Sequence, residues 1–201
     1  MLGDRYYYHR LNKKNQSLYR LILKAATDYV TSFRSYIQES YSEKDLAVIN
    51  RAIIYDNPYL FYYCGLISVR YFSPNEVQIN LSFDFEQSES AELKKKLKKQ
   101  TAAFLQSIKL SDKTEEERVR AIHDLLSSKV IYDRNNIDTN TIGKSEEYKY
   151  AHSILGVMLN KKAVCEGIAK AFKYLLTRLI LDALLLPVQP PTPLYLYLEQ
   201  K

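Results

Sequence analysis

Cys165 is the residue whose type and place could best do chemistry. We expect it at the first turn of a helix, directly after a turn that carries Lys161 and Lys162. A helix N-terminus presents unpaired amides and a partial positive charge, and both stabilise a thiolate. Gly167 would let another backbone or a substrate approach the helix start. From the residues alone, Cys165 is either a nucleophile or a small buried hydrophobic residue, which is the commoner fate of a free cysteine.

Few side chains could serve as a base for this thiol, because the chain has only three histidines. His123 lies at the edge of the apolar face of its predicted helix, and we expect a structural role for it. His152 precedes Cys165 in the neighbouring segment, and we expect a supporting role. His9 lies near the start of the chain. These histidines and the two cysteines lack the spacing of a metal site, and no phosphate-binding loop is present, so we expect no metal and no cofactor.

The positive charge of the chain is concentrated in one segment. Of the net charge of +6, residues 91–110 contribute +5 through six lysines and one acid. A nucleic-acid-binding face usually recruits basic residues from several elements, so we expect no nucleic-acid partner. The lysines form either a solvated helix face or an anion-binding stripe. The chain also holds 18 Tyr and 7 Phe, which predicts a folded core.

No segment predicts a membrane span or an export signal. The most apolar stretch, residues 174–188, is interrupted by Arg178, Asp182 and Pro187. It falls short of the roughly 20 apolar residues that a spanning helix needs. The first twenty residues are charged and lack the apolar region of a signal peptide. The compartment stays open.

Hydrophobic periodicity predicts an α+β fold with a small antiparallel hairpin. The three- and four-residue apolar spacing predicts helices over 11–38, 43–55, 88–108, 114–130 and 150–159, and another that starts near 164–165. Ser42 and Thr114 are expected to cap two of them, and Pro58 to end the second. Residues 66–72 and 76–85 have strand character and flank a turn, whereas 133–147 reads as a loop. We expect a helical N-terminal extension with the hairpin (1–87), a core (88–178) and a Leu/Pro-rich tail (179–201).

The stretch from Tyr150 to Leu176, YAHSILGVMLNKKAVCEGIAKAFKYLL, resembles the nucleophile segment of the transglutaminase-like superfamily. The match is to the bacterial transglutaminase/protease-like proteins, in which K-A-V-C-x-G-Y-A-x-A-F is typical. Ile168 replaces the usual Tyr. Weaker matches lie upstream, so that the resemblance covers about residues 6–178; they are Tyr6–Tyr8 with Leu11-Asn12, Tyr55–Pro58 with Phe61-Tyr62, and Ile131–Asp133.

This resemblance implies a papain-like core in which Cys165 is the nucleophile. A His and an Asp on strands after the cysteine helix would complete the site, and Tyr150, His152, Glu166 and Gly167 would form the supporting groove. The substrate would be a protein or peptide, whose acyl group passes through a thioester to an amine or to water. Members of this family are often exported or at the cell surface.

The segment that should carry the His and the Asp departs from this pattern. After Leu176 the sequence has no His and no Trp, and its only acids are Asp182 and Glu199. We therefore expect a domain that is cut short after the nucleophile helix and is inactive or nearly so. An uncovered apolar face of that helix, with Ile168, Phe172 and Leu175, would then favour self-association. The alternatives are a non-catalytic module that binds protein or cell-wall polymer, and a live hydrolase with an unrecognised base.

Overall fold

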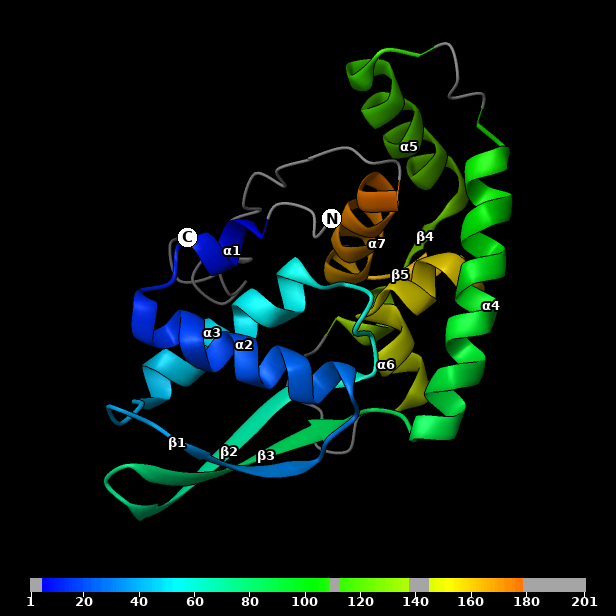
Figure 1. Cartoon of the computed structure of the whole chain (residues 1–201). Coiled ribbons are helices and arrows are strands. Elements are labelled where there is room, and N and C mark those ends of the chain that lie inside the picture. The colour runs from blue at the N-terminus through cyan, green and yellow to red at the C-terminus, as the bar shows by residue number, and fades with distance from the viewer. Residues whose placement is uncertain (1–4, 109–112, 138–144, 179–201) are drawn as a thin grey trace, which may run out of the picture.

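A computed structural model describes residues 5–108, 113–137 and 145–178 of the chain (Figure 1). It has a mixed α+β fold, as expected from the sequence. A three-stranded sheet lies at one end of the molecule, α5 lies at the other, and α4 runs along one side (Figure 1). The buried core is continuous from Leu11 to Leu176. The predicted tail, 179–201, and residues 138–144 of the predicted loop lie outside the described residues.

The first third of the chain forms three helices, and here one prediction is wrong. The helix expected over 11–38 is α2, Lys13–Thr27, followed by strand β1, Ser32–Tyr36. Tyr29 adopts a left-handed conformation with φ 60°. The Val30 amide then donates to the Ala25 carbonyl at 2.8 Å and the Tyr29 amide to Ala26 at 3.3 Å, a Schellman motif that ends the helix. α1 (Tyr6–His9) precedes α2, and α3 (Glu43–Asp56) follows β1.

The predicted hairpin is present and gains a third strand. β2 (Tyr63–Ser73) and β3 (Glu76–Phe83) pair antiparallel, and β1 pairs with the other edge of β3. Val77, Ile79 and Leu81 of β3 are buried, so alternate residues of the strand face the core. The intervening residues of β3, Gln78 and Asn80, are polar and half-buried, and the sheet also exposes the apolar side chains of Leu66 and Phe72.

The two predicted N-caps are confirmed. Ser42 caps α3 and Thr114 caps α5, Glu115–Lys129, each with a complete capping box. α4 spans Gln87–Gln106. The helix expected over 150–159 is instead α6, Glu146–Ala151, followed by the π-helical turn η2, Gly156–Asn160. Gly156 sets this arrangement, because a Cβ there would lie 2.6 Å from the Tyr150 carbonyl oxygen and 2.7 Å from that of Lys162.

Short strands and a last helix complete the described chain. β4 (Ile131–Tyr132) pairs in parallel with β5 (Lys162–Ala163), and the 3₁₀ turn η1 covers Arg134–Asn136. α7 spans Cys165–Arg178 and packs against α5. Among the described residues, no helix combines the length and apolarity that crossing a bilayer requires.

The expected exposed apolar face on α7 is not found. Leu175 is fully buried, and Ile168 and Phe172 are half-buried against the core. The His123 ring of α5 lies 6.5 Å from the Phe172 ring, edge-on, so α5 provides cover that the sequence did not reveal. The basis for self-association through this face is therefore removed.

Candidate functional site

Cys165 lies at the first residue of α7 and is exposed. The segment before it is held on both sides by backbone hydrogen bonds. The Asp133 amide donates to the Ala163 carbonyl at 2.9 Å, and the Val164 amide donates to the Ala151 carbonyl at 3.1 Å. The predicted position of this cysteine at a helix start is thus confirmed, and the thiol faces solvent instead of a closed core.

Gly167 permits a close approach of backbone to the helix start. A Cβ at this position would lie 2.2 Å from the carbonyl oxygen of Ala151 and 3.0 Å from that of Ser153. Contacts below 3.0 Å are essentially never made by real Cβ atoms. Of the two uses expected for Gly167, the structure thus shows the approach of another backbone, which comes from the end of α6.

Glu166 is the centre of a charged network behind the cysteine. Its Oε2 lies 2.8 Å from His152 Nδ1, and its Oε1 lies 2.7 Å from Lys170 Nζ. Lys170 also donates to the His152 carbonyl at 3.0 Å, which ties the end of α6 to the start of α7. Burial acts to raise the pKa of Glu166, but the hydrogen bond from His152 and the charge of Lys170 outweigh it and lower the pKa to about 2. Glu166 is therefore ionised at neutral pH.

His152 is fully engaged and does not serve Cys165. Its Nε2 lies 2.8 Å from the backbone carbonyl of Asn136, which can only accept a hydrogen bond. Its Nδ1 faces the ionised Glu166 carboxylate, which also only accepts. Neither ring nitrogen is therefore directed at the Cys165 thiol. The ring also stacks on Tyr148 at 4.0 Å.

Asp133 anchors the loop that brings Asn136 to this network. It is buried, forms an ion pair with Lys162 at 3.1 Å, and accepts hydrogen bonds from the Asn135 amide and the Asn136 side chain. Burial alone would raise the pKa of Asp133, but the hydrogen bonds from Asn136 and Lys162 hold it below the ordinary value. The β4–η1 segment is thereby fixed beside α7.

Tyr132 lies next to the thiol of Cys165. Burial, the Cys165 charge and a hydrogen bond with the Cys165 side chain raise the pKa of Tyr132, whereas a hydrogen bond from the Cys165 backbone lowers it. Burial raises the pKa of Tyr55 to about 12, with smaller contributions that include Glu166 and Cys165. In the same chain segment as Tyr132, Ile131 is 68% and Ile137 47% exposed. The phenol of Tyr132 is thus the polar group that meets the thiol.

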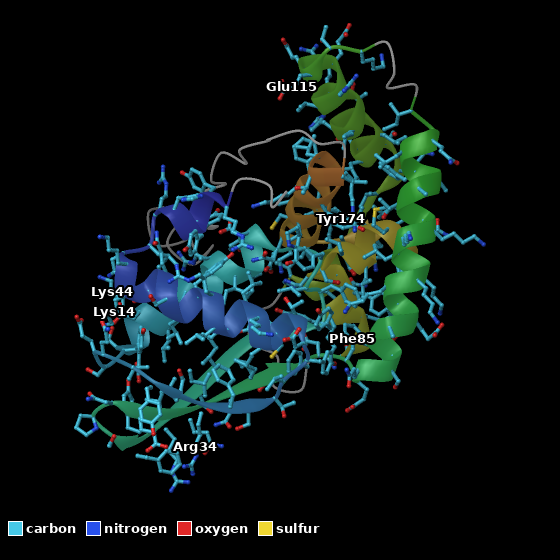
Figure 2. The ribbon with its side chains drawn as sticks, in the orientation of Figure 1. Lys14, Arg34, Lys44, Phe85, Glu115 and Tyr174 are labelled. Carbon is cyan, nitrogen blue, oxygen red and sulfur yellow. The ribbon has the colours of Figure 1, made fainter. Side chains whose placement is uncertain are left out.

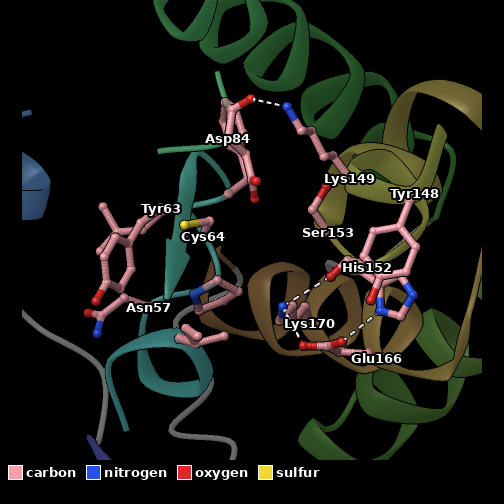
Figure 3. Close-up of a pocket in the computed structure, with 14 residues that line it drawn as sticks. Asn57, Tyr63, Cys64, Asp84, Tyr148, Lys149, His152, Ser153, Glu166 and Lys170 are labelled. Atoms are coloured by element: carbon pink, nitrogen blue, oxygen red, sulfur yellow. Dashed lines mark hydrogen bonds and ion pairs between the residues drawn. The ribbon is translucent and has the colours of Figure 1, made fainter. Parts of the chain in front are cut away.

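A small pocket of about 90 Å³ opens on the other side of the charged network. Figure 3 shows Cys64 and Asn57 on one wall and Glu166, His152 and Lys170 on the other. Cys165 is not among the described residues that line it. Cys64 is half-buried, and its thiol donates to the Ser82 carbonyl at 3.2 Å.

The structure brings together four of the five predicted site residues. Cys165, Glu166 and Gly167 are consecutive on α7, and His152 joins them through Glu166. Tyr150 does not, because it faces Phe85 at 5.9 Å and the side of α4. His123 is exposed beside Asp124, and His9 lies on α1.

Other residues of the site were missed from the sequence. Tyr55, Tyr132 and Asp133 lie in segments that carry the weaker family resemblance, but we did not predict them as site residues. The i,i+4 placement of Glu166 and Lys170 could have been noticed as a helical ion pair. Among the described residues, no group of His, Cys, Asp and Glu could hold a metal ion. No protein-family model matches the chain, and a search of curated proteins finds no match.

Proposed function

We propose that this chain carries the nucleophile-bearing part of a transglutaminase-like cysteine acyl-transfer centre, with Cys165 as the nucleophile and a protein or peptide acyl group as the substrate. The observation that carries the proposal is the exposed Cys165 at the first residue of a 14-residue helix. That position supplies the unpaired amides and the positive end of the helix dipole that favour a thiolate.

The surroundings of Cys165 support a site that is held in place. Gly167 seats α7 on the end of α6, and the contacts of Glu166 with His152 and Lys170 fix the same junction from behind. A catalytic group must be positioned to within a fraction of an ångström, which needs this kind of support. The papain-like core that we infer would mount its cysteine in the same way.

The described residues support acylation of Cys165 better than they support repeated turnover. The thiolate sulfur would attack the carbonyl carbon and form a C–S bond, and the leaving group would depart with the electron pair of the bond that breaks. A poor leaving group such as an amine must be protonated, and hydrolysis of the thioester needs a base. Both nitrogens of His152 are engaged elsewhere, and no imidazole contacts Cys165 in the described part of the chain. We therefore propose acylation without efficient turnover.

An activated ester separates these steps. With 4-nitrophenyl acetate, whose leaving group needs no proton, we expect a burst of about one nitrophenolate per chain, followed by slow release. Cys165→Ser should abolish the burst and Cys64→Ser should keep it, and mass spectrometry should locate the acetyl group on Cys165. A burst that survives in Cys165→Ser, or an acetyl group on Cys64, would contradict the assignment. Sustained turnover of a peptide amide would instead show that a base is present.

A further inference from the structure

The lysines of α4 are poorly neutralised. Lys95 pairs with Glu92 at 2.7 Å, and the Lys94 ammonium lies 4.1 Å from the centre of the Tyr62 ring. Lys96 lies four residues after the same Glu92, and its charge helps to lower the pKa of that carboxyl. Lys98 and Lys99 form no ion pair within the described part of the chain. Lys95 and Lys99 are four residues apart and Lys96 and Lys99 are three apart, so like charges face each other along the helix. Like charges at this spacing destabilise a helix.

Two of these lysines line a hollow between α4 and the segment that leads to Cys165. The hollow has a volume of about 380 Å³. Lys96, Lys99 and Gln100 line it from α4, and Tyr150, Leu159 and Asn160 line it from α6 and η2. All of these side chains except Leu159 can donate a hydrogen bond, and none of them is acidic. The volume is in the range of ligand sites in proteins.

Basic residues from two further elements lie on the same flank. Lys161 follows Asn160, and its ammonium lies 5.8 Å from the centre of the Phe104 ring of α4. Lys129, at the end of α5, is close enough to repel it, because burial and the charge of Lys129 lower the pKa of Lys161. The sequence suggested that the positive charge is confined to one helix. The structure adds Lys161 and Lys129 from other elements to the same side.

We propose that this hollow binds a ligand with two or more linked phosphate groups. A single carboxylate would need only one of the two ammonium groups, whereas a di- or triphosphate chain carries enough charge for Lys96 and Lys99 together and enough oxygens for Gln100, Asn160 and Tyr150. Binding would also relieve the repulsion along α4. The site is separate from Cys165, so its test does not depend on the acyl-transfer proposal.

Isothermal titration calorimetry with inorganic tripolyphosphate at low ionic strength tests this site. The variant K96E/K99E should bind at least about tenfold more weakly than the wild type, because two attractive contacts become repulsive. The control K13E/K44E makes the same change in net charge on exposed residues of α2 and α3. Lys44 lies on the side of the molecule away from α4 (Figure 2). This control should change the affinity by less than about twofold, because distant charges are screened.

A charge-neutralising variant and a second anion, citrate, complete the test. K96Q/K99Q should also weaken binding, and thermal unfolding should show that all three variants fold. Citrate should bind more weakly than tripolyphosphate. No binding of tripolyphosphate, equal loss in both charge-reversal variants, or equal affinity for citrate would each overturn the proposal. Long-chain polyphosphate that binds more tightly than tripolyphosphate would support the site and identify a polymer as its ligand.

Discussion

The two cysteines stand in contrasting surroundings. Cys64 lies on β2, half-buried, and its thiol donates to a carbonyl of the neighbouring strand β3. Cys165 lies on the surface at the start of α7, beside the phenol of Tyr132. The first lies in the eleven-residue strand β2, where the register against β3 shifts between Tyr63 and Ile67, and the second follows two-residue strands, a π turn and Lys161 in a left-handed conformation.

Ion pairs, together with two-residue strands, hold the segment around Cys165. Glu166, Lys170 and Asp133 have ionic contacts within this junction, whereas the sheet that contains Cys64 is joined by uncharged side chains such as Ser32 and Asn80 and by the Arg34–Glu76 ion pair at its other end. Networks of this kind fix a geometry more than they add stability, since buried charges must first lose their water. The comparison therefore indicates that the start of α7 is held for position.

The strongest expected effect comes from the ion pair that joins the two regions. Asp56, fully buried at the end of α3, lies 3.4 Å from Lys173 of α7 and accepts hydrogen bonds from the Tyr7 and Tyr8 amides. Asp56→Ala should lower the free energy of unfolding by about 3–5 kcal/mol, because it removes the carboxylate that faces the buried Lys173 ammonium and accepts from the Tyr7 and Tyr8 amides. Urea denaturation measures the loss. Lys24→Ala, which breaks an exposed pair with Asp28, is the control and should cost less than about 1 kcal/mol.

Two glycines test the difference in rigidity. Gly167→Ala should cost about 2–4 kcal/mol, because the new methyl group would overlap the Ala151 backbone. At Gly65, with φ 78°, the methyl group meets the flexible end of Ile54 at 2.5 Å. Gly65→Ala should therefore cost less, about 1–2 kcal/mol, mainly from backbone strain. Urea denaturation measures the free energy of unfolding of both variants. An equal or larger loss for Gly65→Ala would contradict the expected difference in rigidity between the two sites.

The pH dependence of stability should reveal the Glu166 network. The pKa of Glu166 is lowered in the folded protein from 4.5 to about 2, so the carboxylate stabilises the fold above pH 4.5 and loses this effect as the pH falls toward 2. Between pH 5 and 2, the wild type should lose about 1–3 kcal/mol more than Glu166→Gln, after allowance for solvent screening. Parallel denaturation curves for the two proteins across this range would contradict the network.

Local signals predicted most helices of the fold but not their interruptions. Ser42 as an N-cap, and Thr114 with Glu117 three residues later, identified two helix starts. The end of α2 was missed because Tyr29 takes the left-handed position that glycine usually occupies. Strand β1 was missed for a related reason, since its apolar residues also fit the helical period and only pairing with β3 selects the strand.

The candidate site was predictable only where it is local in sequence. Cys165 at a helix start and Gly167 at a close approach both follow from one short segment. Tyr132 and Asn136 reach that segment through the parallel pairing of β4 with β5, which depends on tertiary packing. Tyr150 was placed in the groove because the family resemblance implied it. α6 begins at Glu146 and turns Tyr150 toward α4 instead.

The rate of iodoacetamide labelling at neutral pH, followed for each cysteine by peptide mass spectrometry, tests the central claim most directly. We expect Cys165 to react at least about tenfold faster than Cys64, and faster than the same cysteine in the chain unfolded in concentrated urea, because the folded helix start stabilises the thiolate. Labelling of Cys165 at the rate of Cys64, or more slowly than in the unfolded chain, would show that the fold does not activate this thiol.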